Sequence, residues 1–347
     1  MENVSVKESV KEYYGDVLGS SDDLATDACC TIEDTPSYLR DAIGRVHPEV
    51  TNRYYGCGLV LPLGLEGARV LDLGCGAGRD VYILSQLVGD KGHVVGVDMT
   101  EAQLAVAREH QAWHADQFNQ AKSNVTFLEG DIERLLELDL EPQSFDVIVS
   151  NCVINLCTNK PAVFEAAHAL LKPGGEMYFA DVYADKQLPP EAINHPKAHG
   201  ECLAGALYWE DFISLAKGSG FDDPRLVTHR PLGVHDDDLN ELLDGARFQS
   251  ATYRLFKASD ESELISNAMA TYRGGVPHTD ESFEFDKHNN FKMGIPMAVS
   301  GPTAGTLRES RFAPFFDLGP ADDEVENTDK PQSALSPFSE ASKNCCG

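Results

Sequence analysis

Residues 68–98, ARVLDLGCGAGRDVYILSQLVGDKGHVVGVD, contain the clearest pattern of secondary structure in the chain. A short run of β-branched and apolar residues ends in a cluster of glycines, and the apolar-periodic segment VYILSQLVG follows it. HVVGVD then has the pattern of a second buried strand. The order strand, glycine turn, helix and strand is typical of a parallel sheet that carries helices on its faces.

The same alternation continues along the chain as far as Lys257. EAQLAVAREHQAWHADQF predicts one long amphipathic helix, and NVTFLEGD, FDVIVSN and GEMYFADVY predict further strands. We therefore expect an α/β fold with a doubly wound parallel sheet. After Lys257 the segments YRGGVP, FEFDKHNNFKMG and RFAPFFDL break this rhythm and predict a small appended domain.

The charge balance restricts the possible partners. The chain carries 28 Lys and Arg against 56 Asp and Glu, a formal charge of −28, which argues against binding to nucleic acid or to anionic lipid. No apolar run reaches the roughly 18 residues of a membrane span, and the first residues show no secretory pattern. We expect a cytoplasmic protein without a nucleic-acid or membrane partner, in which the nine cysteines are thiols, ligands or catalytic groups.

The first motif with chemical meaning is the glycine turn. Asp72, Gly74, Gly76 and Gly78 form the pattern D-x-G-x-G-x-G between a strand and a helix. Glycines permit a tight turn that a ligand can approach closely. Arg79 occupies the third glycine position of the dinucleotide fingerprint. The acid before the first glycine suits an amine-bearing ligand better than a pyrophosphate.

Two further acids follow the next strands. Asp98 ends the second strand, where a carboxylate can accept both hydroxyls of a ribose. Asp131 lies in Gly-Asp-Ile after the third strand, where it could accept from an adenine amine. The glycine turn alone fits any α/β protein, but together with these acids it predicts a nucleoside site.

Cysteines form the second motif. Cys152 directly follows a predicted strand, while Cys57, Cys202 and the pair Cys29–Cys30 lie in loop-like segments. Soft thiolates select soft ions. Three thiolates without histidine suit a pyramidal ion with a lone pair, such as arsenite, whereas zinc would favour C-x-x-C spacing, which is absent. A packing role is the alternative for any single cysteine, and it fits Cys75 and Cys157.

The glycines and acids resemble those of class I S-adenosylmethionine methyltransferases. Four cysteine segments, RYYGCGL, SNCVINL, GECLAGALYW and TDACCT, are similar to those of the arsenite methyltransferases, as are FEFDKHNNFKMG and LRESRFAPFF. The likeness extends from about Asp22 to Leu318. It implies a Rossmann-like, mostly parallel, seven-stranded sheet and a small C-terminal α+β domain.

The resemblance also implies roles for single residues. Cys57, Cys152 and Cys202 correspond to the arsenic(III) ligands, and Cys29 to the redox partner of Cys57. The resemblance favours Cys29 over Cys30, because Cys29 follows an alanine as the matching cysteine of the family does. The role of Cys345 and Cys346, near the end of the chain, stays open. Cofactor contacts are implied for Tyr55 (or its neighbour Tyr54), Asp72, Gly74, Gly76, Gly78, Asp98, Met99, Asp131 and Ile132.

The organisation expected from these observations has four parts. They are an N-terminal helical segment with redox and ligand cysteines (1–65), a cofactor-binding methyltransferase domain (66–257), a small C-terminal domain (258–319) and a disordered acidic tail ending in Cys-Cys (320–347). The lid hypothesis is that the mobile N-terminal cysteine segment closes over the site.

The function implied by the resemblance is methylation of thiolate-bound trivalent arsenic to mono- and dimethylated products, a detoxification. The cofactor would be S-adenosylmethionine, with a thiol reductant, glutathione or thioredoxin, as co-substrate. Arsenite, as a thiol conjugate, and methylarsenite would be the substrates of a monomeric enzyme. Two alternatives remain open: a methyltransferase for a small organic acceptor, and a non-catalytic protein that sequesters soft metals.

Overall fold

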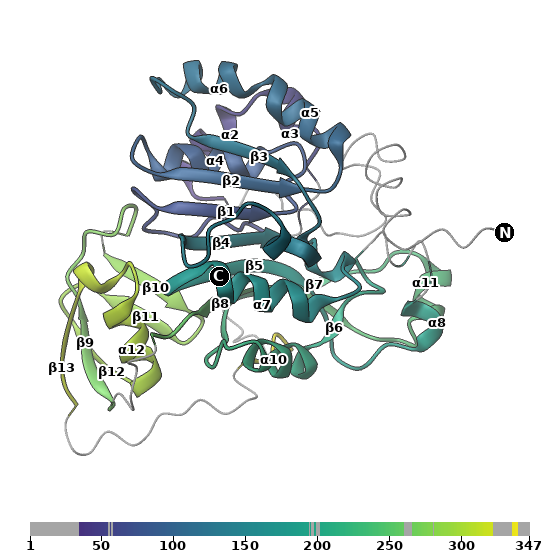
Figure 1. The fold of residues 1–347 in the computed structure, drawn as a ribbon. Helices are drawn as coiled ribbons and strands as arrows, with labels where there is room; N and C mark the ends of the chain where they lie inside the picture. The colour runs from purple at the N-terminus through teal and green to yellow at the C-terminus, as the bar shows by residue number, and fades with distance from the viewer. Residues whose placement is uncertain are drawn as a thin grey trace.

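The computed structural model describes residues 35–54, 56, 58–193, 195, 198, 202–259, 266–279, 281–321 and 335–338. It contains one large sheet with helices on both faces, and two small sheets beside it (Figure 1). The small sheets lie near the amino-terminal ends of the parallel strands, away from the edge where those strands end (Figure 1).

The large sheet runs in the order β3-β2-β1-β4-β5-β8-β7, with the two-residue β6 paired to β5. All pairs are parallel except those that β8 makes with β5 and β7. This confirms the mostly parallel sheet, with β6 as a short addition to the seven expected strands. The strands are β1 Arg69–Leu73, β2 His93–Asp98, β3 Val125–Glu129, β4 Phe145–Asn151, β5 Leu171–Ala184, β6 Leu207–Tyr208, β7 Arg225–Leu232 and β8 Phe248–Phe256.

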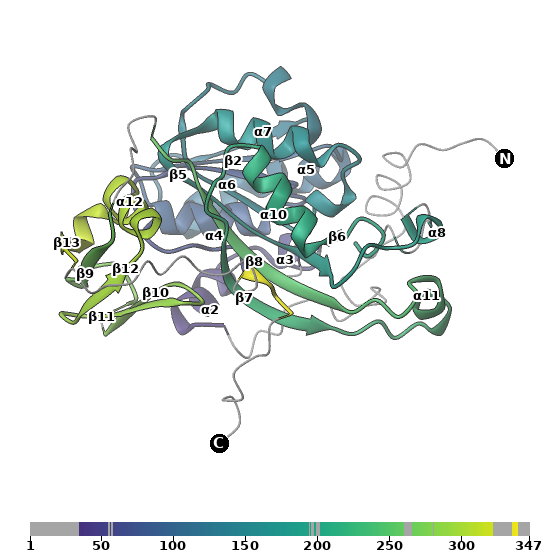
Figure 2. The ribbon, with the colours of Figure 1, turned by 90° about the horizontal axis from the view of Figure 1, so that it is seen from below.

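Helices cover the sheet on both sides, with α7 and α10 on one face and α2 and α4 on the other (Figure 2). Neighbouring strand residues enter different cores: Val70 packs on the α4 side and Leu71 on the α7 side. Two hydrophobic cores thus hold the parallel strands rigidly. The helices are α2 Ser37–Gly44, α3 Pro48–Thr51, α4 Arg79–Val88, α5 Glu101–Glu109, α6 Gln111–Gln117, η4 Ile132–Glu137, η5 Ile154–Leu156, α7 Lys160–Leu170, α8 Pro190–Ile193, α10 Trp209–Gly218 and α11 Asp237–Leu242.

The single long helix predicted after β2 is wrong, because the chain breaks between α5 and α6 at His110. The break accompanies tertiary contacts of His114. Its ring stacks on Tyr82 with centroids 3.5 Å apart, and its Nε2 accepts from the backbone N–H of His47 at 3.0 Å. These contacts of His114, with α4 and with the residues between α2 and α3, outweigh the local sequence preference for one continuous helix.

The C-terminal part is ordered as two small sheets, β10-β11 and β12-β9-β13, with one helix. Its aromatic core includes Phe283, Phe285 and Phe312. Residues 335–338, within the stretch expected to be disordered, pack against the large sheet, where the Tyr253 hydroxyl donates to the Leu335 carbonyl at 2.7 Å. The elements are β9 Ala268–Tyr272, β10 Ser282–Asp286, β11 Asn289–Lys292, β12 Pro296–Val299, α12 Gly301–Glu309, η6 Ala313–Phe315 and β13 Phe316–Pro320.

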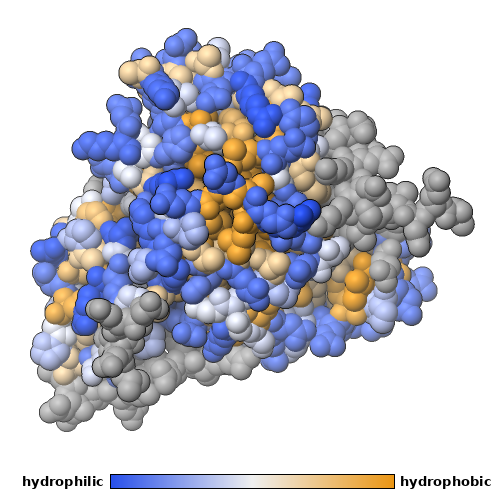
Figure 3. All heavy atoms as spheres, in the orientation of Figure 1, coloured by the Kyte–Doolittle hydropathy of each residue, from blue (hydrophilic) through white to orange (hydrophobic). Residues whose placement is uncertain are grey.

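Hydrophilic residues cover much of the face drawn in Figure 3, in a chain of formal charge −28. On the face drawn in Figure 3, apolar residues gather over the middle of the molecule between hydrophilic ones. Within the described residues, we find no helix with the length and apolar character needed to cross a membrane.

Candidate active site

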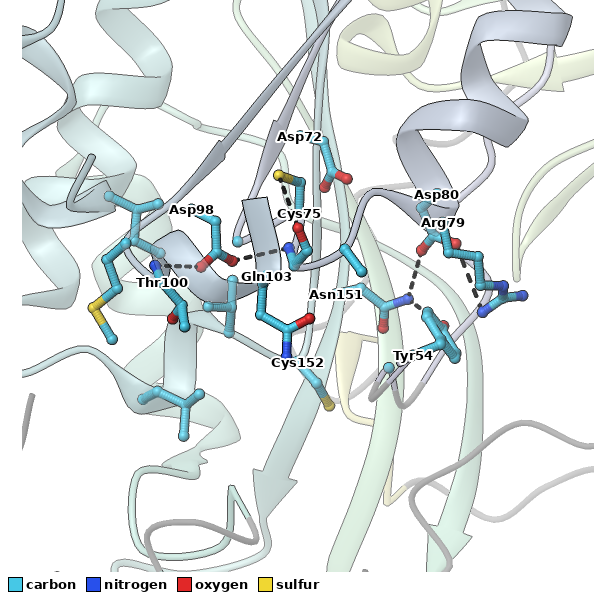
Figure 4. Close-up of a pocket in the computed structure, with 18 of the residues that line it drawn as sticks. Tyr54, Asp72, Cys75, Arg79, Asp80, Asp98, Thr100, Gln103, Asn151 and Cys152 are labelled. Carbon is cyan, nitrogen blue, oxygen red and sulfur yellow. Dashed lines mark hydrogen bonds and ion pairs between the residues drawn. The ribbon is translucent and has the colours of Figure 1, made fainter. Parts of the chain in front are cut away.

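A cleft lies at the carboxyl ends of the parallel strands. Its walls come from the segments that follow β1, β2, β3 and β4, so residues far apart in the chain face one space (Figure 4). This is the edge at which open α/β sheets bind ligands. The predicted cofactor residues that line it are Asp72, Gly74, Gly76, Asp98, Met99, Asp131 and Ile132.

The glycine turn between β1 and α4 has left-handed backbone at Gly74, Gly76 and Gly78, with φ of 71°, 52° and 86°. A Cβ on Gly76 would meet no atom within 4 Å, so this glycine leaves open space beside the backbone. A Cβ on Gly78 would lie 2.9 Å from the Phe127 ring. Gly78 does not line the cleft. Its lack of a side chain serves the packing of α4 on β3 instead.

The Asp98 carboxylate is fixed between two elements. Its Oδ2 accepts from the Gly76 N–H at 2.9 Å, and its Oδ1 accepts from the Thr100 N–H at 2.8 Å (Figure 4). The first contact orients the acid on the glycine turn, and the second ties it to the start of α5. Each carboxylate oxygen keeps further acceptor capacity for a ligand hydroxyl.

Asp72 is a buried acid with only 3% of its surface exposed. Burial, together with the negative Asp80 and Asp98, raises its pKa well above the ordinary range. A bound cation would offset both effects. After β3, the Asp131 Oδ1 accepts from the Glu133 N–H at 2.9 Å and caps the start of η4. This contact holds Asp131 and Ile132 in the wall of the cleft.

Two of the predicted ligand cysteines lie together. The Cys202 thiol donates to the backbone carbonyl of Cys152 at 3.3 Å, and each residue is 6% exposed. Cys152 lines the cleft, and Cys202 is not one of the lining residues. Both have left-handed backbone, with φ of 54° and 59°, which is uncommon for residues other than glycine and is concentrated at functional sites.

The oxidation state differs among the cysteines. Among the described cysteines, Cys152 is disulfide-bonded. Cys75, Cys157 and Cys202 are present as thiols. Cys75 and Cys157 also line the cleft, but burial raises the pKa of both thiols, which suits the packing role expected for them.

Asn151 is a site residue that the sequence analysis missed. Its Nδ2 donates to the Tyr54 hydroxyl at 2.7 Å, to the Gly58 carbonyl at 2.9 Å and to Asp80 Oδ2 at 3.1 Å. Its Oδ1 accepts from the Gly58 N–H at 3.1 Å. Asn151 thus joins the 54–58 segment to the first turn of α4 (Figure 4). Its position directly before Cys152 at the end of a strand was the available signal.

Several predicted residues lie outside the described part of the chain. They are Cys29, Cys30, Tyr55, Cys57, Cys345 and Cys346. The neighbouring Tyr54 lines the cleft, and the Arg79 guanidinium lies 3.5 Å from its ring centroid. The lid hypothesis for the N-terminal segment also falls largely outside the described residues.

Within the described residues, one group of side chains could hold a metal ion: His47, Glu49 and His110, whose ligand atoms lie within 4.8 Å of one another. These side chains already have structural partners. His110 Nε2 pairs with Glu49 at 2.9 Å, and His47 accepts from the Glu49 N–H at 3.3 Å to cap α3. None of the three lines the cleft.

Comparison with known proteins identifies the family. A methyltransferase domain model matches residues 65–220, and an arsenite methyltransferase C-terminal domain model matches residues 266–345. An arsenite methyltransferase of Aquipseudomonas alcaligenes is 51% identical over 311 residues, 89% of each chain. The chain belongs to the arsenite methyltransferase family. The human arsenite methyltransferase is 44% identical over 321 residues, covering 92% of this chain and 85% of its own length.

A solved structure agrees with this membership in the arsenite methyltransferase family. An arsenic(III) S-adenosylmethionine methyltransferase from Chlamydomonas reinhardtii aligns with a TM-score of 0.78 and 46% identity, over 83% of this chain and 97% of its own. The expected fold, recognition and enzyme class are thereby confirmed: an S-adenosylmethionine-dependent methyltransferase whose C-terminal part adds small antiparallel sheets. The cleft fits this cofactor, because Gly76 leaves room beside the turn and Asp72 and Asp98 are acids suited to an amine and a ribose.

Proposed function

We propose that this protein transfers methyl groups from S-adenosylmethionine to trivalent arsenic held by cysteine thiolates, giving mono- and dimethylated arsenicals. The observation that supports it most is the approach of Cys202 to Cys152, 3.3 Å from thiol to carbonyl, beside the cleft that Asp98 lines. A packing role for the two cysteines does not account for their shared left-handed backbone. The arsenic ligands in this proposal are Cys57, Cys152 and Cys202.

The same proposal assigns the cofactor residues. Asp98 accepts from the ribose hydroxyls, Asp72 stabilises the methionine amine, and Asp131 with Ile132 meets the adenine. Met99 packs on the adenine, and Tyr55 approaches the sulfonium. Gly74 and Gly76 let the cofactor approach the backbone, whereas Gly78 contributes to the same turn through packing.

Arsenite binds by exchange. Each thiol that joins arsenic displaces a hydroxyl group as water, and arsenic keeps its lone pair. When bound, S-adenosylmethionine supplies an electrophilic methyl group. Since the lone pair needs no deprotonation, the contribution of the chain is alignment of the arsenic by its thiolates, and no general base is required.

Each methylation oxidises arsenic by two electrons, from the trivalent to the pentavalent state. Two thiolates return these electrons as they join in a disulfide, with Cys29 and Cys57 as the proposed pair. A dithiol or glutathione then reduces the disulfide by thiol exchange.

The wider setting belongs to the same proposal. We expect thioredoxin or glutathione as reductant, arsenite thiol conjugates and methylarsenite as substrates, and a monomer in the cytoplasm. The proposed parts are residues 1–65, 66–257, 258–319 and 320–347, although 335–338 pack on the large sheet.

A turnover assay tests the proposal. The reduced protein would be incubated with arsenite, S-adenosylmethionine and glutathione, and the arsenic species separated by chromatography. We expect methylated arsenic from the parent and from Cys157→Ser, and none from Cys202→Ser, which should still bind S-adenosylmethionine. Absence of methylated arsenic from a parent that binds the cofactor would favour a small organic acceptor instead.

A further inference from the structure

The backbone conformation of Cys152 and Cys202 must be stabilised by contacts with other residues. Both residues have left-handed φ, 54° and 59°, and a side chain at such a position is strained unless surrounding contacts fix it. The Cys152 N–H is held by the Ala180 carbonyl at 2.9 Å on the adjacent β5. The Cys202 segment needs a separate contact that holds it beside Cys152.

Asn155 makes that contact. It lies three residues after Cys152, in η5, and is 3% exposed. Its Nδ2 donates to the Val182 carbonyl at 2.7 Å and to the Cys202 carbonyl at 3.4 Å. One buried amide therefore joins the Cys152 loop, strand β5 and the Cys202 segment.

Asp181 and Lys160 orient this loop from two sides. Asp181 is 2% exposed, and its Oδ2 accepts from the Asn155 N–H at 3.0 Å while its Oδ1 accepts from the Val182 N–H at 2.9 Å. The Lys160 ammonium donates to the Asn155 carbonyl at 3.3 Å and to the Cys157 carbonyl at 2.8 Å. The main chain of Asn155 is thus held at both its N–H and its carbonyl.

The Cys202 segment lies directly on the same residue. A Cβ added to Gly205 would be 1.8 Å from the Asn155 carbonyl oxygen, so only glycine permits this approach. Asn155 therefore contacts the Cys202 segment twice, through its side-chain amide at Cys202 and through its backbone carbonyl at Gly205.

We propose that Asn155, oriented by Asp181, is a positioning residue that sets the separation of the Cys152 and Cys202 thiols for one trivalent arsenic atom. The inference rests on the proposed function, because it needs these cysteines to be arsenic ligands. Arsenic bonded to two sulfurs fixes how far apart they lie, and a pair already held there loses less freedom on binding. The cofactor acids belong to other strand ends and should be unaffected.

The experiment measures initial rates of arsenic methylation by the full-length protein over a matrix of arsenite and S-adenosylmethionine concentrations. Loss of the buried amide contact in Asn155→Ala should raise KM for arsenite about tenfold or more, with KM for S-adenosylmethionine within about twofold. Gly205→Ala, which pushes the Cys202 segment away, should show the same split. Asn155→Ser, which keeps a donor, should recover part of the arsenite affinity.

Asn124→Ala is the matched control. Asn124 is also a buried asparagine, bonded to Ser85 and Gly89, but it precedes the edge strand β3, which β2 and β1 separate from β4. It should lower thermal stability while leaving KM for arsenite unchanged.

The outcomes separate the two proposals. Arsenite KM values in Asn155→Ala and Gly205→Ala equal to that of the parent would overturn the positioning role while the function stands. An equal rise of both KM values would also overturn it, since it indicates a general structural effect. If Asn155→Ala does not fold, Gly205→Ala and Asn155→Ser decide. A parent that makes no methylated arsenic would instead overturn the proposed function.

Discussion

The Cys202 thiol lies 3.3 Å from the backbone carbonyl oxygen of Cys152, although the two residues are 50 positions apart in the chain. The contact joins the loop after β4 to a segment that follows β5. Because both cysteines have left-handed backbone, we expect a change in the contacts that support either one to alter the distance between the thiols. The function of this site therefore depends on residues that never touch a ligand, as well as on those that do.

Replacing Asp98 should weaken cofactor binding. Asp98→Asn keeps the shape but removes the charge that holds the Gly76 and Thr100 N–H groups. Charge-assisted bonds are roughly twice as strong as neutral ones, so we expect S-adenosylmethionine affinity to fall about 10- to 100-fold. Calorimetric titration measures this. Asp116→Asn, an exposed acid on α6, is the control, and equal affinities in the two variants would contradict the role of Asp98.

Two glycines of the turn should respond differently to alanine. At Gly76 the new methyl meets open space at the cleft, so Gly76→Ala should mainly obstruct the cofactor, with about 1–2 kcal/mol lost to the left-handed backbone. At Gly78 it would meet the Phe127 ring at 2.9 Å, so stability should fall further. Urea unfolding measures the loss of stability in both variants, and cofactor titration measures the loss of binding. A Gly76→Ala protein less stable than Gly78→Ala would contradict this prediction.

Asp181 should give the unfolding free energy a distinct pH dependence. Burial raises its pKa to about 7, whereas an unfolded aspartate has a pKa of about 3.9. Between these values the folded state retains a proton that the unfolded state has released. The stability contributed by this group is therefore full below about pH 4, falls as the pH rises to about 7 and is level above that.

Urea unfolding of the parent and of Asp181→Asn across this window measures the effect. The stability of the parent relative to the variant should decline by a few kcal/mol as the pH rises, because only the parent carries the titrating group. Parallel pH profiles for the two proteins would show that Asp181 does not titrate in this range.

Removing Glu176 should destabilise the attachment of the C-terminal domain. This fully buried acid pairs with Arg254 at 2.6 Å and with Arg311 at 2.5 Å. The two guanidinium groups lower the pKa of Glu176 despite its burial. Glu176→Ala would leave both cations without their anion, which costs about 3–5 kcal/mol.

Thermal unfolding of Glu176→Ala checks this prediction, with Glu137→Ala as the control. Glu137 pairs with Arg134 on the exposed surface, where solvent screens the charges, so its removal should barely move the midpoint. Similar midpoints for the two variants would mean that the buried pair does not hold the domains together.

Much of the fold was predictable because it depends on local patterns. The alternation of apolar runs and glycine turns predicted β1, β2 and the turn between them, and Asp72 and Asp98 line the cleft as expected. The break at His110 was missed because it accompanies contacts of His114 with Tyr82 and His47 rather than any local signal. The ordered residues 335–338 were missed for the same reason.

Some residues of the site were likewise predictable from local sequence, and others were not. Asn151 and Asn155 were overlooked because an asparagine has no periodic signature, and its importance appears only when its partners from distant segments are known. Asp80 was passed over as part of the glycine motif, although it meets Asn151.

The parallel sheet, the glycine turn, the acids at the strand ends and the cysteine segments typical of the family could all be recognised in the sequence. These are properties of residue type and spacing, which local steric preference and burial translate directly into structure. The three-dimensional arrangement was needed to see that the Asn155 amide contacts the Cys202 carbonyl, and that Gly78 packs on Phe127 and does not line the cleft. Such contacts depend on how separate segments dock, and docking is set by the shapes of both packed surfaces together.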